Sequence, residues 1–183
     1  EDSIGSFQMK FSTRIDTNLH AERLFDIVGN FHALERLLIQ QGGSVARIDP
    51  SNDPDISLGW NIEFEWRGKA RQLRLAVTWF DRPDQMMLAG HSEALHLTVV
   101  ATVVALTRTK SRLISETEIR PRNMKARLML QTAKLGKAQL DRRYQRLIGD
   151  YVQQMQIAQE IARVSDYDEP QVNSTTLRAV EAR

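Results

Sequence analysis

The sequence contains no cysteine, and its 183 residues include only four histidines. The absence of cysteine excludes a disulfide-stapled scaffold and a thiol nucleophile. The histidines at positions 20, 32, 91 and 96 are scattered and do not follow metal-ligand spacing, so we expect no metal site. No glycine-rich phosphate loop precedes a helix, because the stretch QGGS follows one. We therefore expect neither a bound nucleotide nor another cofactor.

Long apolar runs and a strong net charge are also lacking. The formal net charge is +2, and no segment reaches the apolar length that spans a bilayer. The lack of a spanning segment and of an apolar leader predicts a cytoplasmic protein without stable membrane insertion. Because the net charge is small, we do not expect nucleic acid as a partner. Positive charge is nevertheless concentrated between residues 122 and 146, where Asp141 is the one acid. This segment is either a solvated helix face or a surface for an anionic partner.

The periodicity of the apolar residues predicts an α+β chain. Alternation in residues 9–17 indicates a strand, and helical spacing over residues 21–38, interrupted at Gly29-Asn30, indicates two short helices. Turn signals then separate about six strands. The clearest of these strands cover residues 59–66, 71–80, 95–106 and 111–121. The segment 95–106 is apolar on both faces in part, which is typical of a central strand covered on both sides. A long helix closes the pattern, and it has about 40 residues if it runs unbroken from Asn123 to Ala162.

The chain length fits one domain with a polar segment at each end. Residues 1–8 show no pattern and are interpreted as an N-terminal extension, either native or vector-derived. Residues 9–164 form the predicted domain. Residues 165–183 are polar, contain Pro170, and are expected to be a flexible tail.

The element order resembles the SRPBCC superfamily of START-like, birch-pollen-allergen-like helix-grip proteins. The resemblance rests on RIDTNLHAERLFDIVGNFHALERLL near the start and on RPRNMKARLMLQTAKLGKAQLDRRYQRLIGDYVQQM near the end. It covers about residues 9–155 and includes the branch of polyketide cyclases and dehydrases. It implies a curved antiparallel sheet of about seven strands wrapped on the long C-terminal helix, with two short helices between the first and second strands and a cavity between sheet and helix. It carries no catalytic residue, because the superfamily has no shared catalytic motif.

Candidate cavity residues come from the dry faces of two strands and from the long helix. Alternation places one set of apolar side chains on a common face. At about 100° per residue, a second set shares one helix sector: Met129, Ala133, Lys137, Leu140, Tyr144, Leu147, Tyr151 and Met155. The candidate wall consists of Trp60, Phe64, Trp66, Leu75, Val77, Trp79, Lys137 and Tyr144. The aromatic residues of the two strands are either core filler or cavity wall. His91 and Arg71 are further polar candidates.

Lys137 is the unusual member of this helix sector, because a buried ammonium requires a partner. It can snorkel outward, pair with an acid or contact an anionic ligand group. The acids that we expect first as partners are Glu63, Glu116 and Glu118.

The sequence leads to three hypotheses about function. The first is a carrier or sensor that binds a small or medium hydrophobic molecule or a lipid in an internal cavity. The second is an enzyme of the polyketide cyclase or dehydratase type, although no catalytic residue can be assigned. The third is an interaction or membrane-surface module that uses the basic helix. Because Leu128 and Leu135 lie opposite the predicted buried stripe, and the helix is long enough to overrun the domain toward Ile157 and Ile161, a homodimer is a further option.

Overall fold

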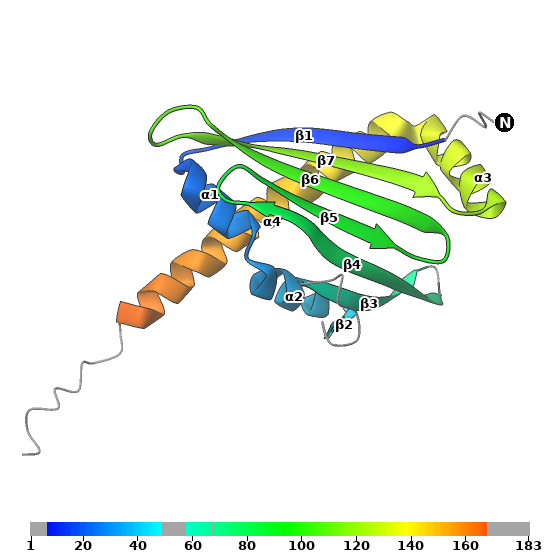
Figure 1. Ribbon diagram of the computed structural model, residues 1–183, viewed down its shortest axis with the longest axis horizontal. Coiled ribbons are helices and arrows are strands. Elements are labelled where there is room, and N and C mark those ends of the chain that lie inside the picture. Colours follow the sequence, from blue (N-terminus) through cyan, green and yellow to red (C-terminus); the bar gives the residue numbers. More distant parts are fainter. Residues whose placement is uncertain (1–6, 49–57, 67, 168–183) are drawn as a thin grey trace, which may run out of the picture.

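The computed structural model describes residues 7–48, 58–66 and 68–167. Its main feature is a seven-stranded antiparallel sheet with the order β1-β7-β6-β5-β4-β3-β2. The strands are β1 (Met9–Thr17), β2 (Ser44–Arg47), β3 (Gly59–Trp66), β4 (Lys69–Asp81), β5 (Gln85–His91), β6 (Leu95–Ala105) and β7 (Ser111–Pro121). Figure 1 shows that the C-terminal helix crosses one side of this sheet. The predicted fold class and the order of elements are confirmed.

The helices are α1 (Ala21–Val28), α2 (Phe31–Gln40), α3 (Met124–Ala133) and α4 (Lys137–Tyr167). The predicted break between the two short helices lies at Gly29, where the backbone passes close to its neighbours. A Cβ atom at this position would lie 3.2 Å from both the Met86 Cε and the Phe25 carbonyl oxygen. The next helix begins at once, because the Asn30 side chain accepts a hydrogen bond from the backbone N–H of Ala33.

The predicted long C-terminal helix is confirmed, but it is not one unbroken α-helix. A 3₁₀ turn, η1 (Lys134–Gly136), separates α3 from α4. Glycine at position 136 contributes to this interruption, because it costs about 1 kcal/mol relative to alanine inside a helix. Figure 1 shows the consequence, since α3 and α4 run in clearly different directions. The helix also continues to Tyr167, three residues into the segment that we predicted to be a tail, and residues 168–183 lie outside the described part.

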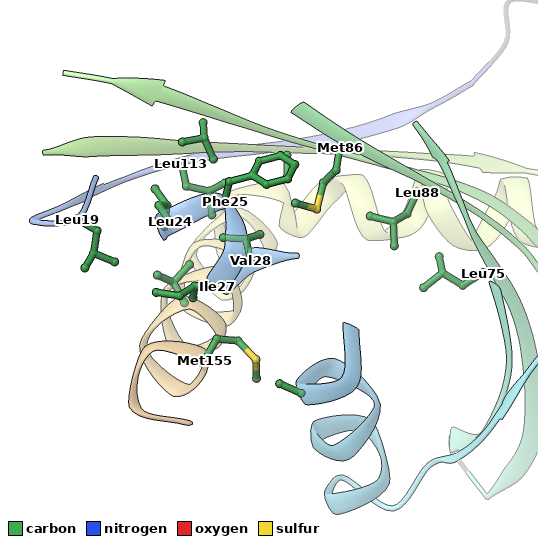
Figure 2. Close-up of a cluster of buried hydrophobic side chains, with 14 of the residues drawn as sticks. Leu19, Leu24, Phe25, Ile27, Val28, Leu75, Met86, Leu88, Leu113 and Met155 are labelled. Atoms are coloured by element: carbon green, nitrogen blue, oxygen red, sulfur yellow. The ribbon is translucent and has the colours of Figure 1, made fainter. Parts of the chain in front are cut away.

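The core lies between the sheet, α1 and the C-terminal half of α4. Figure 2 shows α1 inserted there, with Phe25 directed toward Met86 of β5 and with Met155 of α4 on the other side. Leu24, Phe25 and Ile27 of α1 are almost completely buried. Tyr151 of α4 joins the two helices, because its hydroxyl donates a hydrogen bond of 2.8 Å to the carbonyl oxygen of Val28. Burial raises the pKa of Tyr151 to about 12.

No helix within residues 7–48, 58–66 and 68–167 combines the length and the apolar character needed to cross a membrane.

Candidate functional site

The sheet has an inner face, which bears the core residues Leu75, Met86, Leu88 and Leu113, and an opposite outer face. Strand β6 is central in the sheet, as predicted, but it is not covered on both sides. Its inner-face residues Ala101 and Val103 are buried, whereas Val104 on the outer face is exposed. The inner face is therefore the side on which a ligand would meet apolar groups shielded from water.

Three hydroxyl groups, which we call the hydroxyl cluster, gather between the inner face and α4. Tyr144 Oη lies 2.8 Å from Ser115 Oγ and 2.8 Å from Thr117 Oγ1. Ser115 and Thr117 are buried, and the Tyr144 ring packs against Phe11 at a centroid distance of 5.4 Å. Sequence reasoning identified Tyr144 but missed both β7 hydroxyls. Their signal is the alternation in β7, which puts Ser115 and Thr117 on the same face as buried Leu113.

Trp60 belongs to the hydrophobic core. Only 2% of its surface is exposed, its ring packs against Phe31 at 5.4 Å, and its indole N–H donates to Glu35 Oε1 at 2.5 Å. The Arg47 guanidinium also donates to this carboxylate at 2.6 Å. The hydrogen bond from Arg47 and the weaker effect of that from Trp60 lower the pKa of Glu35 below its usual 4.5.

Phe64, Leu75 and Val77 lie on the predicted face. Leu75 is buried, Val77 is half-buried, and Phe64 keeps 38% of its surface exposed although it follows Trp60 and Ile62 along the same face of β3. Arg71 pairs with Phe64 in the register between β3 and β4. Phe64 is thus an inner-face aromatic that the core does not cover. Trp66 belongs to β3, but its side chain lies outside the described part.

The expectation that Trp79 shares this face is wrong. The register of β4 against β5 shifts between Val77, which pairs with Leu88, and Trp79, which pairs with Met87. The irregularity adds one residue to β4, and it turns the Trp79 ring to the outer face, where 53% of its surface is exposed. Phe80 takes the inner position instead, with its ring 5.1 Å from that of Phe25.

Lys137 lies at the edge of the domain, against β1. Its ammonium is 4.6 Å from the centroid of the Phe11 ring and forms an ion pair with Asp141, one helical turn further along α4. The predicted glutamate partners are therefore wrong. Glu118 instead forms ion pairs with Lys10 and Arg120. An acid four residues away in the same helix can reach the ammonium without crossing the domain.

The predicted buried stripe of the long helix is correct in part. Met155 is buried, and Tyr144 and Tyr151 are half-buried, but Met129 and Leu147 are exposed. The bend at η1 explains part of this difference, because residues on the two sides of it no longer share one straight sector. The bend also forms an open hollow of about 420 Å³, which is lined by Thr132, Ala133, Gly136, Gln139, Leu140 and Arg143. None of the predicted wall residues lines this hollow.

His91 lies on the outer face and not in the inner space for which we considered it. It pairs with His96 of β6 in the sheet register, and the two ring centroids are 6.2 Å apart. Partial burial, followed by the positive charges of Arg122 and Arg74 and the effect of His96, lowers the pKa of His91 below 6.5.

We expect an NMR titration of the His91 imidazole to give a midpoint below 6.5, and Arg122→Gln to raise it. Because the folded protein binds a proton at His91 less tightly than the unfolded chain does, the contribution of His91 to the free energy of unfolding should fall as the pH drops below about 6.5. Lys110→Gln, at the other end of β6, is the control and should leave the midpoint unchanged. A midpoint at or above 6.5 in the parent would contradict the assignment.

Within the described ranges, histidine and acidic side chains do not form a group of three or more that could hold a metal ion.

No protein-family model and no curated protein matches the sequence. Solved structures do match in fold. A norcoclaurine synthase point mutant from Thalictrum flavum, in complex with a transition-state analogue, superposes with a TM-score of 0.59 at 10% identity and covers 86% of this chain and 99% of its own.

Two bacterial structures superpose equally well. The Zhui aromatase/cyclase from a Streptomyces species has a TM-score of 0.57 at 8% identity, over 82% of this chain and 94% of its own. A protein of Thermus thermophilus has a TM-score of 0.59 at 9% identity, over 82% of this chain and 99% of its own. At these identities the likeness concerns the backbone alone. The chain has the helix-grip fold that these structures share.

Proposed function

We propose that the protein binds a small or medium hydrophobic molecule between the inner face of the sheet and α4, as a carrier or sensor. The observation that carries this proposal is the hydroxyl cluster. Three hydroxyls provide three donors, and the two bonds that join Tyr144 to Ser115 and Thr117 use two of them. One O–H and several lone pairs remain for a ligand. Apolar walls with a few convergent polar groups are the usual composition of a small-molecule site.

Phe64, Leu75, Val77 and Tyr144 form the proposed lining. Phe64 supplies apolar surface that the core leaves open, and Tyr144 supplies the polar contact. The norcoclaurine synthase of Thalictrum flavum, which shares the fold, has been crystallised with dopamine and hydroxybenzaldehyde. By this analogy, the expected ligand has an aromatic or aliphatic body and one hydroxyl or carbonyl group.

An environment-sensitive apolar dye should bind with saturable, roughly one-to-one stoichiometry. We expect Phe64→Ala to weaken dye binding about tenfold, because part of an aromatic contact worth roughly 1.5–3 kcal/mol when fully buried is lost. The matched control is Trp79→Ala, which removes a half-exposed aromatic from the opposite face of the neighbouring strand. If the parent and Phe64→Ala bound the dye with equal affinity while both were folded, Phe64 would not belong to the lining of the ligand site.

Tyr144→Phe tests the polar contact. It should weaken binding of ligands that carry a hydroxyl or carbonyl by about five- to tenfold, the equivalent of one hydrogen bond, and should spare purely apolar dyes. Lys137→Met is the control, because its ammonium is engaged with Asp141 and Phe11. If Lys137→Met rather than Tyr144→Phe weakened the binding of a fatty acid, the polar contact would belong to the lysine.

A cyclase or dehydratase of the polyketide-cyclase type is the second candidate. The favouring observation is that two of the matching structures are enzymes, a synthase and an aromatase/cyclase. In that case the Tyr144 hydroxyl would act as a proton donor to a bound carbonyl. Native mass spectrometry of the freshly purified protein distinguishes the two functions. A co-purified compound that stays unchanged on prolonged incubation supports a carrier, and one that loses a water molecule supports a dehydratase.

A further inference from the structure

The helix α3 exposes large apolar side chains that the rest of the described chain does not cover. Met124, Leu128 and Leu135 have 75%, 66% and 89% of their surfaces exposed. Met124 and Leu128 are four residues apart and share one side of α3, and Leu135 is exposed on the adjoining η1. We call this set the α3 stripe. The opposite side of α3 packs inward through Ala126 and Leu130, both buried. The helix is therefore held in place while the stripe faces outward.

Positive charge surrounds the α3 stripe. Lys125 and Arg127 lie in α3, Arg122 precedes it and Lys134 follows it, and no acidic residue occurs between positions 119 and 140. Arg122 donates to a backbone carbonyl and Lys134 lies over an aromatic ring, and within the part of the chain that the structure describes neither cation is paired with an acid. Among the described residues, the three large apolar side chains with the highest exposed fractions thus lie inside a basic patch.

This combination identifies the class of partner. Two copies of the protein meeting through their α3 stripes would bring these cations together, which disfavours self-association here. A nucleic acid would satisfy the charges but would leave Leu128 and Leu135 exposed to water. A bilayer with anionic headgroups satisfies both, because the apolar side chains enter the acyl boundary while lysine and arginine stay at the headgroup level.

We propose that α3 and η1 dock the protein onto an anionic lipid bilayer, with Leu128 and Leu135 inserted at the interface. The helix α3 lies at one end of the sheet, beside the bend between α3 and α4 (Figure 1). The C-terminal turns of α4 extend beyond the opposite end. The open hollow at the bend shares Thr132 with α3 and Gly136 with η1, so it lies beside the docked surface. The proposal is independent of the ligand-binding function, which is measured without lipid.

Co-sedimentation with vesicles tests the docking. The parent protein should bind vesicles of phosphatidylcholine mixed with phosphatidylserine, but not phosphatidylcholine alone, and its binding should weaken as salt is added. The pair Leu128→Ser and Leu135→Ser should lower the partition coefficient at least about tenfold. Lys125→Gln and Arg127→Gln should each lower it about fivefold.

The distal end of α4 provides matched controls. Ile157→Ser with Ile161→Ser removes two exposed apolar side chains from the projecting helix, and Arg163→Gln removes one charge there. These variants should bind vesicles as the parent does. Circular dichroism confirms the fold of every variant. Equal vesicle binding by the parent and the Leu128, Leu135 pair would overturn the proposal.

The absence of cysteine permits a direct readout of insertion. Leu128→Cys, labelled with an environment-sensitive fluorophore, should shift its emission to the blue on anionic vesicles, whereas labelled Ile161→Cys should not. A blue shift at position 161 instead, or no shift at either position, would overturn the assignment. A further outcome would also overturn the bilayer proposal. If duplex DNA bound the parent as tightly as the vesicles do, and bound the Leu128→Ser, Leu135→Ser variant equally well, the basic patch would be a nucleic-acid site.

Discussion

Replacing Trp60 by alanine is expected to lower the free energy of unfolding by about 3–5 kcal/mol. The indole is almost completely buried, packs against Phe31 and donates a hydrogen bond to Glu35. Its removal leaves a cavity under α2. It also removes one hydrogen-bond donor from the Glu35 carboxylate, which keeps the hydrogen bond from Arg47. Urea denaturation followed by far-ultraviolet circular dichroism measures the loss without relying on tryptophan fluorescence.

Two further variants make this result specific. Trp60→Phe keeps the aromatic packing and loses the N–H donor, so it should cost less, about 1–3 kcal/mol. Trp79→Ala removes the same side chain from the outer face and should cost about 1 kcal/mol or less. A smaller loss for Trp60→Ala than for Trp79→Ala would show that the assignment of the two faces is reversed.

Phe25→Ala in α1 should be similarly severe, at about 3–5 kcal/mol, because the ring is completely buried between the sheet and α4. Its edge-to-face contact with Phe80 exists only because β4 gains a residue before Trp79. The same urea measurement applies, with Leu147→Ala, an exposed position on α4, as the control.

A double-mutant cycle isolates the effect of the bulge. Phe25→Leu and Phe80→Leu should couple by about 0.5–1.5 kcal/mol, the usual value for an aromatic pair. Phe25→Leu and Trp79→Leu should be additive within about 0.5 kcal/mol. Coupling to Trp79 in place of Phe80 would mean that β4 alternates without interruption, as its sequence alone predicts.

Local periodicity was sufficient to predict the order of the strands and helices of this fold, except for the 3₁₀ turn that divides the C-terminal helix. Strands β1, β3 and β7 have the predicted bounds, because their alternation is regular and turn residues bracket them. The break between α1 and α2 was predictable from Gly29-Asn30 for the same reason. Tyr144 could be placed toward the sheet because helical spacing holds within α4.

The candidate site was less predictable, because most of the errors depend on contacts between distant segments. One additional residue in β4 reverses Trp79 and Phe80, and only the pairing with β5 reveals it. The partner of Lys137 is the exception, because Asp141 lies four residues further along the same helix, a spacing that is visible in the sequence. Ser115 and Thr117 gain significance only when Tyr144 meets them from a segment 29 and 27 residues away.

By itself, the sequence determined the type and order of the elements and the concentration of positive charge near α3, since both follow from neighbouring residues. The tertiary structure alone decided which aromatic rings face inward and which hydroxyls meet. These properties depend on the strand register and on how α4 packs against the sheet. A shift of one residue moves a side chain to the other face of the sheet, although the hydrophobic pattern that predicts the strand hardly changes.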